Sequence, residues 1–191
     1  YVSLGNSLTA GFADGALYKV AQKNSMPSIL AQQFAAVANG GSFTQPLMPD
    51  NIGALTYQGV PILEPRFFLN LDPDPNEEDE DPAPQRLITN STLPTLTTNY
   101  SSNSVQFNNL GVPGAKSFHL LAQGYGSESG IFAGTANPYF VRMASSPNTS
   151  VLADAIAQQP SFVSLWIGNN DVLGYALSGG DGTNPITPMA G

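Results

Sequence analysis

The sequence predicts an α/β fold built on a parallel sheet, and three observations point to it. Strand and helix signals alternate along the 191 residues, as expected when helices pack on a sheet. The segment 162–167 is almost continuously apolar, which is typical of a parallel strand buried on both faces. Each predicted strand ends in a turn rich in Gly, Asn or Ser. The length suits a single domain over residues 1–191.

The first elements are a strand and a helix. Residues 1–4 (Tyr-Val-Ser-Leu) are predicted to form a buried strand, followed by a turn at Gly5-Asn6-Ser7. A helix is then expected from Ser25, a suitable N-cap, with Pro27 in its first turn and apolar residues at helical spacing. The sequence Asn39-Gly40-Gly41 is expected to end it.

Residues 41–103 are predicted to be a loop-rich insertion. Nine of the sixteen prolines lie here, and each removes a backbone donor and fixes φ. The acidic run 72–81 is expected to be a solvated, mobile surface loop. The alternative is a calcium site, but the run lacks the order of an EF-hand loop and its central Gly. The apolar pairs Ile62-Leu63 and Phe67-Phe68 suggest that part of the insertion is packed.

The second half of the chain repeats the alternation. A strand is expected at 105–110, then short helices at 115–121 and 139–144. A further helix is expected at 151–158, capped by Ser150 and followed by Pro160. The strand at 162–167 follows and ends in Gly168-Asn169-Asn170-Asp171.

Composition excludes several classes of function. The net charge is −8, but seven of the fourteen acids lie between Asp72 and Asp81, and removing those seven charges leaves −1. No basic stripe could follow nucleic-acid phosphates. The chain has no Cys and a single His, which argues against thiol chemistry, disulfides and a multi-His metal site. We therefore expect no cofactor and no metal.

Only 10% of the residues are charged, against about a quarter in typical proteins. Such a Lys-poor surface, covered mainly by Asn, Gln, Ser and Thr, is common in exported proteins. We expect an extracytoplasmic location (secreted, periplasmic or lipid-anchored) with the export signal removed, and no transmembrane segment.

Three turns offer groups that could act together. In open α/β sheets, ligands bind at the carboxyl ends of the strands. The first turn places the Ser7 hydroxyl there, the second offers the backbone N–H of Gly114, and the third offers the side-chain amide of Asn170. Two N–H donors beside a hydroxyl form an oxyanion hole, so Ser7, Gly114 and Asn170 are the predicted catalytic residues.

These turns resemble the motif blocks of the SGNH, or GDSL-type, hydrolases. Residues 1–11 (YVSLGNSLTAG) are similar to the first block, residues 109–114 (NLGVPG) to the second, and residues 168–171 (GNND) to the third. The resemblance implies that Ser7 is the nucleophile, with its own N–H, Gly114 and Asn170 as the oxyanion hole. It implies a three-layer α/β/α sandwich with a flavodoxin-like sheet, and a serine esterase or acylhydrolase acting on small-molecule, lipid or acylated-sugar esters.

The chain departs from the family pattern at two points. Asn6 stands where the family usually has Asp, and no Asp-x-x-His block, which supplies the base, is present. We expect a missing C-terminal segment of the same protein to carry that block and to complete the sheet, whose third strand would otherwise be a bare apolar edge. The 191 residues alone should then be nearly inactive.

Two other interpretations remain open. One is a non-catalytic carbohydrate- or lipid-binding module on the same scaffold, which would suit the altered Asn6 and the absent base. The other pairs Ser7 with His119, which requires His119 to reach Ser7 Oγ. We expect instead that His119 packs or caps near the site and that Asp171 holds the third turn.

Overall fold

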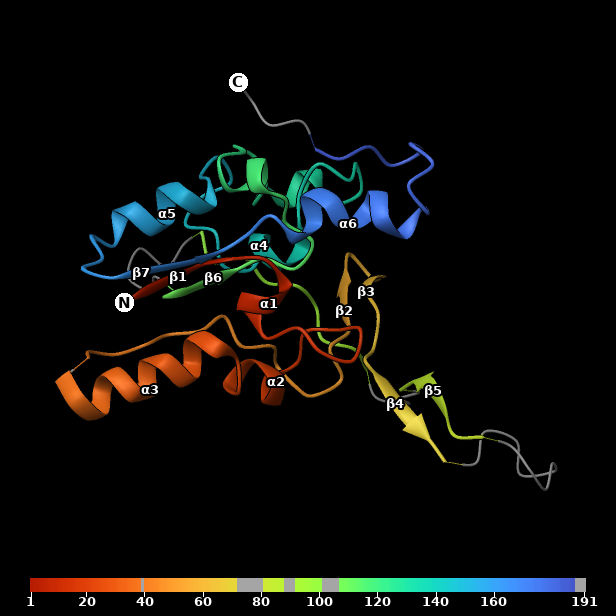
Figure 1. Cartoon of the computed structure of the whole chain (residues 1–191), viewed down its shortest axis with the longest axis horizontal. Helices are drawn as coiled ribbons and strands as arrows, with labels where there is room; N and C mark the ends of the chain where they lie inside the picture. Colours follow the sequence, from red (N-terminus) through yellow and green to blue (C-terminus); the bar gives the residue numbers. More distant parts are fainter. Residues whose placement is uncertain (39, 72–80, 88–91, 101–106, 188–191) are drawn as a thin grey trace.

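The computed structural model describes residues 1–38, 40–71, 81–87, 92–100 and 107–187, and it has an α/β fold (Figure 1). Its main sheet has three parallel strands in the order β6-β1-β7. The central strand, β1 (Val2–Gly5), lies between β6 (Asn109–Gly111) and β7 (Val163–Trp166). The first strand of the chain therefore lies between the two strands of this sheet that follow it in the sequence.

Helices lie on both sides of this sheet (Figure 1). The short helix α1 (Ser7–Ala10), α2 (Lys19–Lys23) and α3 (Met26–Ala38) lie on one side. On the other side lie α4 (Pro138–Val141) and α5 (Val151–Ala157). The chain also forms 3-10 turns η1 (Ser117–Leu120) and η2 (Glu128–Gly130), and a last helix α6 (Asn169–Leu177).

Local sequence explains where two of the helices begin. Ser25 Oγ accepts a hydrogen bond from the N–H of Ser28 at 3.4 Å. Ser150 Oγ accepts one from the N–H of Ala153 at 3.1 Å. Both predicted N-caps are therefore confirmed. The predicted apolar face of α3 is only partly buried, because Ile29 is 48% and Val37 81% exposed.

Two clusters of buried side chains form the core. The first joins β1 and β6 to α4 and α5, with Phe140 and Val112 fully buried. The second joins α1 to the insertion through Met48 and Leu55. Gly111 allows α1 to approach β6, because a Cβ there would lie 2.4 Å from the backbone nitrogen of Ala10.

The insertion is more ordered than a loop. It contains two antiparallel hairpins, β2 (Leu55–Tyr57) with β3 (Val60–Leu63), and β4 (Phe67–Asn70) with β5 (Ala83–Arg86). Figure 1 shows the second hairpin projecting from the body of the molecule. The expected packing of Ile62 and Leu63 is confirmed, since both contact the second cluster. Most of the acidic run, residues 72–80, lies outside the described residues.

Three expectations differ from the structure. The strand expected at 105–110 is β6, which spans only Asn109–Gly111. Residues 107 and 108 are not part of it, and positions 105 and 106 lie outside the described residues. The helix expected at 115–121 is a single 3-10 turn. The strand at 162–167 is present as β7, but it is not buried on both faces, and in this chain it forms the apolar edge expected for the third strand. Its large side chains, Phe162, Val163, Leu165 and Trp166, are 44–61% exposed.

No helix in the described part of the chain is long and apolar enough to cross a membrane.

Candidate functional site

The turns after β1, β6 and β7 meet at the carboxyl end of the sheet. Backbone hydrogen bonds join them, from Val112 N–H to Gly5 C=O at 2.9 Å and from Asn6 N–H to the carbonyl of Trp166 at 3.1 Å. The three predicted residues, Ser7, Gly114 and Asn170, lie in or directly after these turns. The parallel sheet therefore brings together segments that are more than 100 positions apart in the sequence.

Ser7 is the first residue of α1 and is half-buried. The Asn6 side chain caps this helix by accepting a hydrogen bond from the N–H of Leu8 at 3.0 Å. Among the described residues, neither the hydroxyl nor the N–H of Ser7 has a hydrogen-bond partner, and the first N–H groups of a helix have no partner within it. Both groups are free to meet a ligand.

Gly114 is exposed and adopts a left-handed conformation with φ of 80°. A Cβ at this position would meet only Asn137 Nδ2, at 3.9 Å. Glycine is therefore required here by the backbone conformation rather than by lack of space. Its N–H has no acceptor among the described residues and can donate to a bound group.

Asn137 holds the turn that contains Gly114. Its Nδ2 donates to the carbonyl of Pro113 at 2.9 Å and to Tyr125 Oη at 3.0 Å. Burial raises the pKa of Tyr125 to about 12, so this hydroxyl stays neutral. Sequence reasoning missed Asn137, although an Asn before Pro138 is a recognisable helix cap, and its side chain also accepts from Tyr139 N–H.

Asn170 lies in the first turn of α6, whose N-cap Gly168 has a φ of 106°. The Asn170 Nδ2 donates to the carbonyl of Ala115 at 2.8 Å, which fixes the side chain against the second turn. An amide nitrogen carries two N–H groups. The second has no partner among the described residues, so Asn170 is anchored and still has a donor available.

His119 does not serve Ser7 in this structure. Its Nδ1 accepts a hydrogen bond from the N–H of Lys116 at 3.0 Å, and its ring stacks on Tyr125 with 4.5 Å between centroids. Burial lowers the pKa of His119, and Lys116 adds to this effect. No hydrogen bond joins it to Ser7 within the described residues. The expectation that His119 caps and packs is confirmed.

Asp171 holds the third turn, as expected. Its carboxylate accepts hydrogen bonds from the N–H and the hydroxyl of Ser117, at 2.9 and 2.6 Å. Three successive side chains of α6 therefore have three different partners. Asn169 contacts Asn6, Asn170 contacts Ala115 and Asp171 contacts Ser117.

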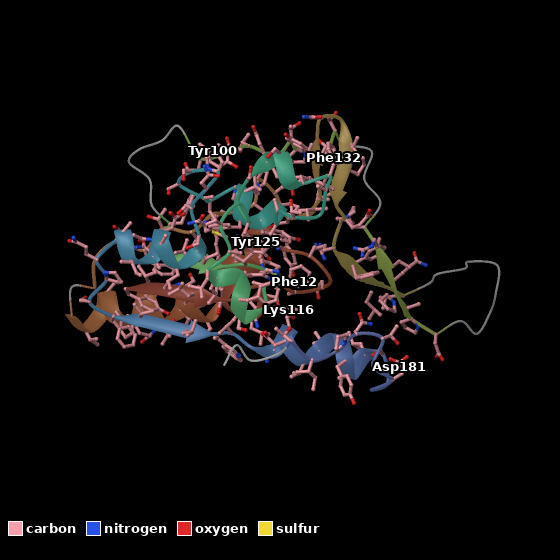
Figure 2. The ribbon with its side chains drawn as sticks, turned by 90° about the horizontal axis from the view of Figure 1, so that it is seen from above. Phe12, Tyr100, Lys116, Tyr125, Phe132 and Asp181 are labelled. Atoms are coloured by element: carbon pink, nitrogen blue, oxygen red, sulfur yellow. The ribbon has the colours of Figure 1, made fainter. Side chains whose placement is uncertain are left out.

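A cavity of about 280 Å³ lies between η1, α6 and the segment that follows α6. Its walls include Lys116, Phe118, Asp171 and Ile186, and Lys116 is labelled in Figure 2. Asp171 and Lys116 follow Asn170 and Gly114 by one and two positions in the sequence, but Ser7, Gly114 and Asn170 do not themselves line the cavity.

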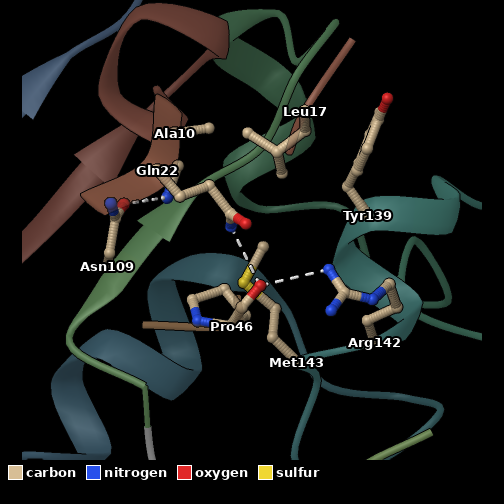
Figure 3. A pocket seen from close by; sticks show the side chains of 9 residues that line it. Ala10, Leu17, Gln22, Pro46, Asn109, Tyr139, Arg142 and Met143 are labelled. Carbon is tan, nitrogen blue, oxygen red and sulfur yellow. Dashed lines mark hydrogen bonds between the residues drawn. The ribbon is translucent and has the colours of Figure 1, made fainter. Parts of the chain in front are cut away.

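The region around Arg142, Gln22 and Pro46 has a structural role instead (Figure 3). Arg142 donates to the carbonyls of Pro46 and Leu47, at 3.1 and 2.7 Å, and Gln22 also donates to Pro46. Burial lowers the pKa of Arg142 to about 10, which leaves it cationic at neutral pH. The region has no room for a water molecule, so Arg142 joins α4 to the insertion rather than binding a ligand.

The described residues contain no group of three or more His, Asp or Glu side chains placed to hold a metal ion. Comparisons of the chain with protein-family models, with curated proteins and with solved structures found no match.

Proposed function

We propose that this protein is a serine ester hydrolase of the SGNH type. The observation that carries the proposal is the meeting of Ser7, Gly114 and Asn170 at the carboxyl ends of three parallel strands, with hydrogen bonds joining their turns. The motif order and the β6-β1-β7 strand order support a three-layer sandwich with a flavodoxin-like sheet.

In this proposal Ser7 Oγ attacks the acyl carbonyl of an ester. The oxyanion that forms receives hydrogen bonds from the N–H groups of Ser7 and Gly114 and from the free N–H of Asn170. The alcohol leaves, and water then releases the acyl group from Ser7. The substrates are small-molecule, lipid or acylated-sugar esters, and no cofactor takes part. The Lys-poor composition supports an extracytoplasmic location.

The reaction needs a base for Ser7, and the described residues place none beside it. We propose that a further segment of the same protein supplies this base and pairs with the outer edge of β7. The exposed apolar side chains of β7 support this, as does α6, which has no buried residue. Natural proteins avoid leaving such an edge uncovered.

A second function is favoured by one observation, the unpartnered Ser7 hydroxyl. Without a base, the same three turns suit a non-catalytic module that binds a carbohydrate or lipid. The two functions differ in whether Ser7 changes covalently.

Hydrolysis of a short p-nitrophenyl ester by the complete gene product tests the proposal. Replacing Ser7 by Ala should lower kcat by a factor on the order of 10⁴ to 10⁶, because the nucleophile is lost. Ser3→Ala is the matched control, since Ser3 lies on β1 and is fully buried. Hydrolysis that survives Ser7→Ala would contradict the proposal, and binding of the ester without hydrolysis would favour the binding module.

A further inference from the structure

We infer that Asn6 is a positioning residue that fixes the oxyanion donor Asn170 through Asn169. The inference rests on the proposed function for the role of Asn170, but its first test does not require activity.

Asn6 is fully buried and uses both ends of its side chain. The Oδ1 atom accepts from Leu8 N–H at 3.0 Å, which caps α1 beside Ser7. The Nδ2 atom donates to Asn169 Oδ1, also at 3.0 Å. One side chain therefore connects the turn that carries the nucleophile to the turn that carries the oxyanion donor.

The contact to Asn169 acts on the neighbouring Asn170. Asn169 and Asn170 are the first two residues of α6 and follow Gly168, whose left-handed backbone gives this turn no side-chain cap of its own. The α6 helix also lacks a buried face that could hold it. Its first turn is held by the side-chain contacts to Asn6, Ala115 and Ser117 and by a backbone hydrogen bond from Thr187 N–H to the Asp171 carbonyl.

An amide at position 6 has a specific use in this arrangement. It offers an acceptor to α1 and a donor to Asn169 at the same time, which a serine is too short to do. A carboxylate offers only acceptors, but it could keep both contacts if the Asn169 amide turned over and donated to it. Substitutions at position 6 can therefore separate the cap of α1 from the link, meaning the hydrogen bond between Asn6 and Asn169.

The test compares Asn6→Ser, which keeps the cap and removes the link, with Asn6→Asp, which keeps both. In the 191-residue protein, the NMR signals of the Asn170 side-chain amide should shift in Asn6→Ser and stay close to wild type in Asn6→Asp. If Asn6 were only a helix cap, the two variants would behave alike. Equal shifts in both variants, or no shift in either, would overturn the inference.

Kinetics of the complete gene product provide the second readout. Asn6→Ser should lower kcat by about 10- to 100-fold with little change in KM, as expected when a supporting contact is lost. In Asn6→Asp, kcat should stay within a few-fold of the wild-type value. A loss of Ser7-dependent hydrolysis would remove the proposed function while leaving the NMR result standing, so the two failures are distinguishable.

A double variant gives a pH signature of direct contact. In Asn6→Asp with Asn169→Asp, two carboxylates would face each other, and neither could donate until one is protonated. Their shared proton raises a folded-state pKa above the unfolded value, so stability should be greatest at low pH and fall as pH rises through that pKa. The fall should be larger in the double variant than in either single variant, because burial alone also raises the pKa of a carboxyl at position 6. A double variant without this excess would contradict the contact.

Discussion

The two strands beside β1 have the same backbone arrangement and opposite environments. Both pair with β1 in parallel, with Leu4 opposite Leu110 on β6 and opposite Leu165 on β7. Leu110 is 1% exposed, whereas Leu165 is 61% exposed. Hydrogen-bonded pairing in a sheet therefore does not determine burial, which depends on the layers that cover its faces.

The helices that lie near the two strands differ in the same way. The α5 helix packs on the side of β1 and β6, and its Val151 and Ala155 are buried in the first core cluster. The α6 helix buries none of its residues, and Leu173 and Leu177 are 46% and 78% exposed. The apolar side chains around β6 are buried in a packed core, whereas the apolar side chains around β7 are exposed.

The largest expected effect comes from one substitution made on both sides. Leu110→Ala should lower the free energy of unfolding by about 2–5 kcal/mol, because it leaves a cavity in a packed cluster. Leu165→Ala should change it by less than about 0.5 kcal/mol, because that side chain is exposed. Chemical denaturation of the 191-residue protein measures both.

Equal losses in the two variants would contradict the comparison and show that β7 is covered in solution, for example by another copy of the chain. The same two substitutions can be compared in the complete gene product. If a further segment covers β7, Leu165→Ala there should cost about 2 kcal/mol or more. A cost that stays near zero would contradict the proposed covering segment.

A smaller effect is expected for two aspartates that bind similar donors. Asp154 is 8% exposed and accepts from the N–H and hydroxyl of Ser145 and from the Thr149 hydroxyl. Asp171 accepts from the N–H and hydroxyl of Ser117 but is more exposed. Asp154→Ala should cost about 2–4 kcal/mol and Asp171→Ala about 1 kcal/mol, since buried unpaired donors are the more expensive.

Thermal and chemical unfolding of the two Asp variants provides the check. A loss in Asp171→Ala that equals or exceeds the loss in Asp154→Ala would mean that the third turn is as firmly packed as the core.

The elements that the sequence predicted well have strong local signals. Ser25 and Ser150 are caps that need only their own helices, and the apolar residues of β1 form a strand whatever surrounds it. The turns after the strands follow from the same local patterns, and their meeting follows from parallel topology. The sequence therefore predicts that the turns carrying Ser7, Gly114 and Asn170 lie together, whereas the catalytic roles of these residues stay a prediction.

The misses depend on contacts between distant positions. The apolar residues of β7 alone predict burial on both faces, whereas its exposure follows from its position as the edge strand of this chain. The contact of Asn6 with Asn169 joins residues 163 positions apart and has no local signal. The hairpins of the insertion were missed because their strands are short and contain prolines, such as Pro61 in β3 and Pro84 in β5.

Covalent trapping shows whether Ser7 is a nucleophile that is assisted by Asn170. The complete gene product would be treated with a fluorophosphonate, which loses fluoride when a serine oxygen attacks its phosphorus, and the labelled peptide would be identified by mass spectrometry. We expect a single adduct on Ser7 that forms at least about 10-fold more slowly in Asn170→Ala. An adduct on another serine, no adduct on Ser7, or a rate unaffected by Asn170→Ala would contradict it.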